Sequence, residues 1–222
     1  TGPVTTLADR ANEQHYEVPA EFFDLVLGPR RKYSSCYWPA GVSNLAEAEE
    51  AMLALTAQRA GLADGQHIVD LGCGWGSFTL WAAERYPNSS ITAISNSHGQ
   101  RAAIEAEARR RGLQNIRVHT ADIADVVAGR ATVLGAGANV DRAVDRVVSI
   151  EMLEHVLNHR AVFQWLAQLL APDGEVFVHV FSNRRSAWRF AVDGDDWVGR
   201  WFFAGGTMPS DDLLDRKSTR LN

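Results

Sequence analysis

The sequence contains little cysteine, no excess of basic charge and no long apolar run. Its 222 residues include two cysteines, Cys36 and Cys73, far apart in the chain, which argues against a disulfide framework and indicates reduced thiols in the cytoplasm. The formal net charge of −5 argues against nucleic acid as a partner. No apolar run reaches the length of a transmembrane helix and no stretch reads as a signal peptide, so we expect no integral membrane segment and at most peripheral contact with lipid.

The composition is that of one globular domain. Hydrophobic residues make up 46% of the chain and charged residues 22%, enough for a substantial core. The chain begins at Thr1 rather than at a methionine, and its last eight residues, DRKSTRLN at 215–222, resemble the translation of a common sequencing adapter. We therefore expect 215–222 to be a non-native tail outside the fold and the natural protein to be longer.

Apolar runs and helical patterns alternate through the middle of the chain. This alternation predicts right-handed β–α–β units and a mostly parallel sheet. The predicted strands are 68–71, 90–95, 116–119, 144–150 and 175–181, and the predicted helices between them run from 77 to 86, 100 to 111 and 159 to 170. Residues 129–143 are small and weakly patterned, and we interpret them as a surface insertion.

Four units are expected along the chain. Residues 1–60 read as a helical cap, with helical patterns at 21–28 and 45–60. Residues 61–184 hold the alternating core, 185–214 read as a lid over the acceptor, and 215–222 form the tail.

The sequence HIVDLGCGWGS, residues 67–77, joins the first strand to the next helix through a glycine turn. Asp70 is followed by glycines at alternate positions, Gly72, Gly74 and Gly76. Glycine allows positive φ and close approach of the backbone to a ligand. A dinucleotide fingerprint has the spacing G-x-G-x-x-G, and Ser77 stands where its third glycine would be. The spacing therefore disfavours a nicotinamide oxidoreductase, while a plain glycine-rich turn remains the alternative to a cofactor site.

The pattern D-x-G-x-G-x-G resembles the first motif of methyltransferases that use S-adenosylmethionine (SAM). With KYSSCYW, DRVVSIEMLEHV, FVHVF and WFFAGGTMPS in this order, the chain resembles the cyclopropane-fatty-acid synthase family, especially its coclaurine N-methyltransferase-like branch. The resemblance implies an α/β, Rossmann-like class I methyltransferase fold. Such a sheet usually has two further strands after the fifth, which we expect this chain to lack.

The same resemblance implies a SAM site. Tyr33 and Ser34 would close over its methionine end, Ser95 and Gln100 would contact the ribose, and Asp122 and Ile123 would lie beside the adenine. The turn itself would comprise Asp70, Gly72, Cys73, Gly74 and Gly76. Ser95 stands at the end of the second strand, where most methyltransferases have an acid, and Ile123 stands where relatives often have an aromatic residue. Ordinary loop polarity is the alternative for Ser95 and Gln100.

The segment SIEMLEHV follows the fourth strand and carries the acceptor-side chemistry. If it is helical, Glu151, Glu154 and His155 share one face. An amine at neutral pH is mostly protonated and needs a base before it can attack. In the N-methyltransferase-like branch the first Glu and the His are the acid–base pair, which implies Glu151 and His155 here. A solvated helix start is the alternative.

Cyclopropane synthesis on a lipid double bond is the second interpretation. The resemblance implies that a bicarbonate ion would then be held by the positions of Ser35, Glu154 and His179, although Ser35 replaces a cysteine. Glu151 is usually glycine in the lipid enzymes, which favours a small amine as the acceptor. A SAM-binding protein without catalysis is a further alternative. We expect no metal site.

The segment DDWVGRWFFAGGTMP supplies the expected lid. Trp197, Trp201 and Phe202 would wall an aromatic and acidic box suited to a cationic amine. Core packing is the alternative for each of these rings.

Overall fold

The computed structural model describes residues 2–6, 19–134, 143–191, 196–201 and 203–214. Its main feature is a five-stranded parallel sheet in the order β3-β2-β1-β4-β5. The strands are β1 (His67–Leu71), β2 (Ser90–Ser95), β3 (Ile116–Thr120), β4 (Val144–Ile150) and β5 (Leu170–His179). The helices are α2 (Ala20–Val26), α3 (Leu45–Arg59), α4 (Ser77–Arg85), α5 (His98–Arg111), α6 (Ile123–Val127) and α7 (His159–Leu169).

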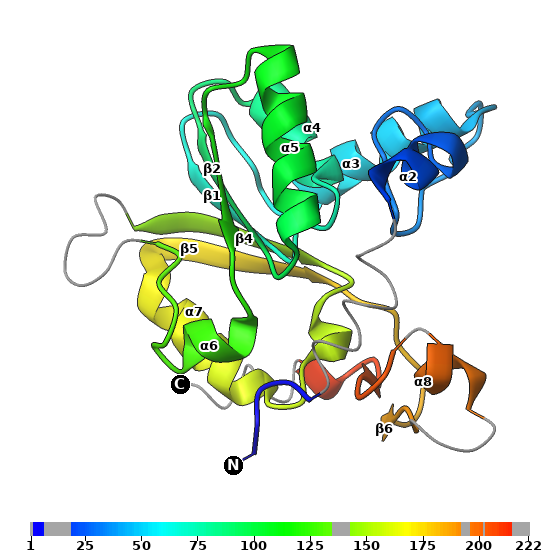
Figure 1. The fold of residues 1–222 in the computed structure, drawn as a ribbon, viewed down its shortest axis with the longest axis vertical. Coiled ribbons are helices and arrows are strands. Elements are labelled where there is room, and N and C mark those ends of the chain that lie inside the picture. The colour runs from blue at the N-terminus through cyan, green and yellow to red at the C-terminus, as the bar shows by residue number, and fades with distance from the viewer. Residues whose placement is uncertain (1, 7–18, 135–142, 192–195, 202, 215–222) are drawn as a thin grey trace.

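Helices cover both faces of this sheet (Figure 1). Alternate strand residues point to opposite faces, and β1 illustrates this. Ile68 packs with α3 and α4 in one core cluster, whereas Val69 packs with α7 in another. All five residues of the central strand β1 are buried, as expected for a parallel sheet that is covered on both faces. The predicted α/β architecture is confirmed.

Two local predictions are wrong. The last strand begins at Leu170 instead of residue 175, because Leu170 already pairs with Val144 before a register shift carries the chain to the pairing of Arg146 with Glu175. Pro172 and Gly174 lie in this irregular stretch. The expected surface insertion also begins inside the fold, since Val133 is only 3% exposed and belongs to the core; residues 135–142 lie outside the described ranges.

The segment after β5 forms small elements. These are β6 (Trp188–Arg189), α8 (Trp197–Trp201) and β7 (Thr207–Met208), with β6 and β7 antiparallel. The one-turn 3-10 helix η1 (Leu153–His155) follows β4 and contacts β7. This arrangement brings 203–208 to the carboxyl ends of the central strands, where sites in α/β sheets lie. The predicted tail at 215–222 lies outside the described residues.

Candidate active site

The glycine turn between β1 and α4 has the backbone that its sequence predicts. Gly72, Gly74 and Gly76 have φ values of +84°, +53° and +80°, which other residues rarely adopt. A side chain at Gly72 would also overlap Cβ and Cγ of Met152. The amide groups of Gly72 and Cys73 both donate to the Ile94 carbonyl at 3.0 Å. The turn is therefore fixed to the end of β2.

Asp70 connects β1 to α4 beneath this turn. Its Oδ2 accepts a hydrogen bond from Thr79 Oγ1 at 2.6 Å, and the residue is 2% exposed. Burial raises the pKa of Asp70 to about 6, against the opposing effects of the Thr79 hydroxyl and the Lys32 charge. The carboxyl group therefore ties the end of β1 to α4. Its raised pKa means that it takes up a proton at about pH 6.

Two cavities meet at this turn. The first has a volume of about 100 Å³ and the second about 260 Å³. The residues that line both are Gly72, Gly74, Glu151 and His155. The first cavity extends toward the ends of β2 and β3, and the second toward the loop between α2 and α3.

The first cavity contains the residues expected at a ribose and an adenine. Ser95 Oγ donates to Gln100 Oε1 at 2.6 Å, and both side chains are buried. Gln100 Nε2 is buried and has no hydrogen-bond partner among the described residues. Asp122 caps α6 by accepting from the Ala124 amide at 2.7 Å, and Ile123 follows it in the cavity wall.

The second cavity contains the expected pair Tyr33 and Ser34, together with Asp70 and Cys73. Lys32 also lines it, 4% exposed, and its Nζ donates to Ser34 Oγ at 2.7 Å. Burial lowers the pKa of Lys32, although nearby acidic groups act in the opposite direction. Sequence reasoning missed this lysine.

Glu151 lies where the two cavities join. Its φ is +50°, an unusual conformation for a residue with a side chain. The Glu151 amide donates to the His179 carbonyl at 2.7 Å, which joins the ends of β4 and β5. The prediction that Glu151, Glu154 and His155 share one helical face is therefore wrong, because the left-handed backbone at Glu151 prevents a helix from starting before η1. Glu151 and His155 still reach the same cavities.

Glu154 lines neither of the two cavities. Its side chain is fully buried, Oε1 accepts from the Phe181 amide at 3.0 Å, and Oε2 lacks a partner in the described part of the chain. Burial raises the pKa of Glu154 to about 8.

His179 and Ser35 also line neither of the two joined cavities. His179 lines a separate cavity beside Arg59, although its Nε2 lies 3.9 Å from Glu151 Oε1. Burial lowers the pKa of His179. Ser35 is exposed and lines neither cavity at the junction. The structure thus does not gather Ser35, Glu154 and His179 around one cavity.

Two of the three aromatic residues expected to wall the acceptor box do not line the two cavities. Trp197 and Trp201 are 61% and 54% exposed and line neither of the two cavities. The reason lies in α8, whose Gly199 packs so closely on the Ala191 backbone that a Cβ there would overlap it. The tryptophans, two residues to either side, face away from that contact. Phe202 lies outside the described residues.

Residues that sequence reasoning missed supply much of the lining. Phe203 lines the second cavity and stacks on His155 with ring centroids 5.0 Å apart. Thr5 and Thr6, from the N-terminal segment, line the first cavity. Trp75 lines the second, and its ring lies 4.8 Å from Phe23. Trp75 lies inside the glycine motif and Phe203 inside the expected lid segment, whereas Thr5 and Thr6 carried no sequence signal.

Within the part of the chain that the structure describes, no helix is both long and apolar enough to cross a membrane. No group of three or more histidine, cysteine, aspartate or glutamate side chains in these ranges could hold a metal ion.

Comparison with known proteins gives relatives of two kinds. The chain is 35% identical over 206 residues to an (S)-coclaurine N-methyltransferase of Thalictrum flavum subsp. glaucum, which covers 92% of this chain and 54% of that protein. It is 26% identical over 200 residues to the cyclopropane-fatty-acyl-phospholipid synthase of Escherichia coli K12, covering 89% and 46%. A crystal structure of coclaurine N-methyltransferase bound to N-methylheliamine and SAH matches with a TM-score of 0.85 at 32% identity, covering 97% of this chain and 60% of that one.

The parallel sheet, the glycine turn and these neighbours define a Rossmann-like methyltransferase fold. Residues 5–221 match the family model of mycolic acid cyclopropane synthetase, and the chain belongs to that family. The resemblance found in the sequence motifs is thereby confirmed. The chain spans about half the length of the curated relatives it matches.

Proposed function

We propose that the protein is a SAM-dependent methyltransferase that methylates the nitrogen of a small amine. The observation that carries this proposal is the position of Glu151 and His155, which line both cavities at the place where the cavities join. A donor spanning the two cavities and an acceptor reaching the junction would meet beside these two groups. The (S)-coclaurine N-methyltransferase relative supports nitrogen as the accepting atom.

The residues present fit SAM. Gln100 Nε2, which lacks a partner among the residues that the structure describes, can donate to a ribose hydroxyl oxygen and would then be satisfied. Gly72, Gly74 and Gly76 present bare α-carbons in this turn, where a side chain would be strained by the positive φ and, at Gly72, would overlap Met152. When bound, SAM supplies a methyl group on a sulfonium, so that an amine lone pair can attack in line as the carbon–sulfur bond breaks.

The chain's own residues would then control the proton of the acceptor. Glu151 and His155 offer a carboxylate and an imidazole to remove the proton that blocks the amine lone pair. Phe203 holds the His155 ring by stacking, which fixes the direction in which its nitrogens point. The aromatic wall and the Glu151 carboxylate would also favour a cationic acceptor over a neutral one.

Transfer of a labelled methyl group to a panel of secondary and tertiary amines tests this proposal. We expect Glu151→Gln and His155→Asn to lower kcat by about 10²–10⁴-fold, while binding of S-adenosylhomocysteine (SAH) stays within a few-fold of wild type. Glu21→Gln, an exposed change on α2, serves as the matched control. If both site variants turn over within twofold of wild type, the acid–base assignment is wrong.

Cyclopropane synthesis is the second candidate, supported by the family model and by the E. coli relative. The dispersal of Ser35, Glu154 and His179 gives less support to a bicarbonate site. Incubation with unsaturated phospholipid vesicles and labelled SAM, with and without bicarbonate, separates this candidate from the first. SAH binding without transfer to amine or lipid would support a binding protein without catalysis.

We further propose a cytoplasmic location. Both cysteines are free thiols, which is typical of a reducing compartment.

A further inference from the structure

Lysine is almost absent from this chain. The sequence holds 22 lysine and arginine residues, and only Lys32 and Lys217 are lysines. Lys217 lies in the stretch that the structure does not describe. The single lysine within the described ranges therefore lines a cavity. The other residues of the lysine and arginine total in these ranges are arginines. An ammonium is a compact charge with three donors, unlike the flat guanidinium fork.

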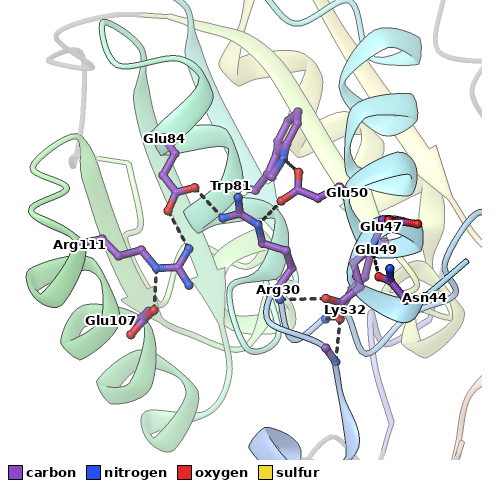
Figure 2. A network of polar contacts seen from close by, with 11 residues as sticks. Arg30, Lys32, Asn44, Glu47, Glu49, Glu50, Trp81, Glu84, Glu107 and Arg111 are labelled. Carbon is purple, nitrogen blue, oxygen red and sulfur yellow. Dashed lines mark hydrogen bonds and ion pairs between the residues drawn. The ribbon is translucent and has the colours of Figure 1, made fainter. Parts of the chain in front are cut away.

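Glu49 of α3 holds the backbone around Lys32 in place. Its side chain is fully buried, and its Oε1 accepts from the amides of Gly28 and Lys32 at 3.1 and 3.0 Å. Oε2 accepts from the Arg30 amide at 2.9 Å. Figure 2 shows Glu49 reaching from α3 to this loop. The Lys32 side chain thus starts from a fixed backbone.

The Lys32 ammonium is buried without a bonded anion. Its one hydrogen bond among the described residues goes to the neutral Ser34 hydroxyl, and no ion pair of Lys32 exists within those ranges. Asp70 accepts from Thr79 instead, and both Glu49 oxygens are taken by amides. Two of the three N–H groups therefore remain for the cavity. Burying a charge without a bonded partner is costly, and although Glu151 and Asp70 offset part of this cost, an anionic oxygen bonded to the ammonium would lower it further.

We propose that the Lys32 ammonium, aligned by Glu49 and Ser34, binds the carboxylate of the amino-acid end of SAM. The inference rests on the proposed function, and it adds the group that recognises the charged tail of the cofactor. The lowered pKa that burial gives Lys32 is in keeping with a cation that lacks a bonded anion. A charge-assisted hydrogen bond from a buried ammonium corresponds to about tenfold to a hundredfold in affinity.

Titration calorimetry with two cofactors tests this inference. SAM and decarboxylated SAM differ only in the carboxylate. We expect wild-type protein to bind SAM at least tenfold more tightly than decarboxylated SAM. Lys32→Gln and Lys32→Met should lose about tenfold to a hundredfold for SAM and little for decarboxylated SAM. Arg117→Gln removes one positive charge from the exposed side of β3 and should change neither affinity.

The outcomes separate the inference from the proposed function. Equal wild-type affinity for the two cofactors, or equal losses for both in the Lys32 variants, would overturn the role of Lys32 and leave the methyltransferase proposal standing. No binding of either cofactor by wild-type protein would count against both. The wild-type comparison decides even if a Lys32 variant does not fold, and thermal unfolding of each variant identifies that case.

Discussion

At the scale of single residues, Glu154 should make stability depend on pH. Its pKa is about 8 in the folded chain and 4.5 as an ordinary glutamate, so between these values the folded state holds a proton that the unfolded state has released. Its contribution is full below about pH 4.5 and is lost as the pH rises toward 8. Ionisation of Glu154 alone should lower the free energy of unfolding by about 1.4 kcal/mol per pH unit in this window, in addition to the effect of Asp70 below about pH 6.

Urea unfolding of wild type and Glu154→Gln across pH 4.5 to 8.5 measures this effect. The neutral amide cannot ionise, so the free energy of unfolding of this variant should depend less on pH. Relative to wild type, the variant should become more stable as the pH rises toward 8.5. Glu21→Gln, on the exposed side of α2, should keep the wild-type slope. Parallel profiles for wild type and Glu154→Gln would contradict the assignment of the proton to Glu154.

Gly72 gives a second prediction at this scale. Alanine there would adopt a φ of +84° and overlap Met152, so Gly72→Ala should lower stability by roughly 1–3 kcal/mol. It should also weaken SAH binding, because the turn must shift. Gly65→Ala is a useful comparison, since Gly65 has a φ of +86° but open space around its Cβ. If Gly72→Ala binds SAH as tightly as Gly65→Ala, the turn does not shape the cofactor site.

At the scale of elements, α3 fixes the loop that carries Lys32 and Ser34. Glu49→Gln would place an amide NH₂ against backbone donors that now face a carboxylate. We expect a loss of about 1–3 kcal/mol for the unsatisfied groups, together with weaker binding of SAM. Chemical denaturation and calorimetry measure the two effects.

Glu50 is the matched control on the same helix. It contacts Arg30 and Trp81, and its side chain is 45% exposed. Figure 2 shows Arg30 between Glu50 and Glu84, with Arg111 between Glu84 and Glu107. Because solvent screens such a pair, Glu50→Gln should cost less than about 1 kcal/mol and leave SAM binding unchanged. Equal effects of the two changes would mean that Glu49 does not position the loop.

Elements were also what the sequence predicted best. The strands at 90–95 and 144–150 are as expected, because their buried positions hold β-branched residues such as Ile91, Ile94, Val147 and Val148. The prediction of a helix carrying Glu151 was wrong because Glu151 has a positive φ, and the sequence gives no indication of this conformation at a residue other than glycine. Strand β5 began early because Leu170 pairs across a register shift that no local pattern encodes. Glu49 carried an overlooked signal, since it lies four residues before the buried Leu53 on one helical face.

At the scale of the whole molecule, cofactor binding should stabilise the fold. The two cavities are lined by residues from the N-terminal segment, the sheet and the segment after β5, so a ligand that fills them contacts parts far apart in the sequence. SAH at one hundred times its Kd should add about 2.7 kcal/mol, a rise in Tm of roughly 5–10 °C for a chain of this size. Differential scanning fluorimetry checks this, with adenosine as the comparison ligand. No rise at saturating SAH would contradict the cofactor assignment.

The site was only partly predictable because segments far apart in the sequence come together to form it. Motif residues such as Asp70, Gly72 and Gln100 could be placed from one strand–turn–helix unit and its neighbour. Phe203 and Thr5 reach the cavities through tertiary contacts that have no periodicity, and the exposure of Trp197 depends on a close contact of Gly199.

Because Lys32 is buried and the chain has only one other lysine, chemical labelling of Lys32 can measure opening of its loop. An amine-reactive reagent can modify the Lys32 side chain only when the loop opens, because the residue is 4% exposed in the folded chain. The peptide containing Lys32 is easily told from that containing Lys217, the other lysine. The rate at which the Lys32 peptide gains label would therefore measure how often the loop over the second cavity swings away, and how far a bound ligand slows it.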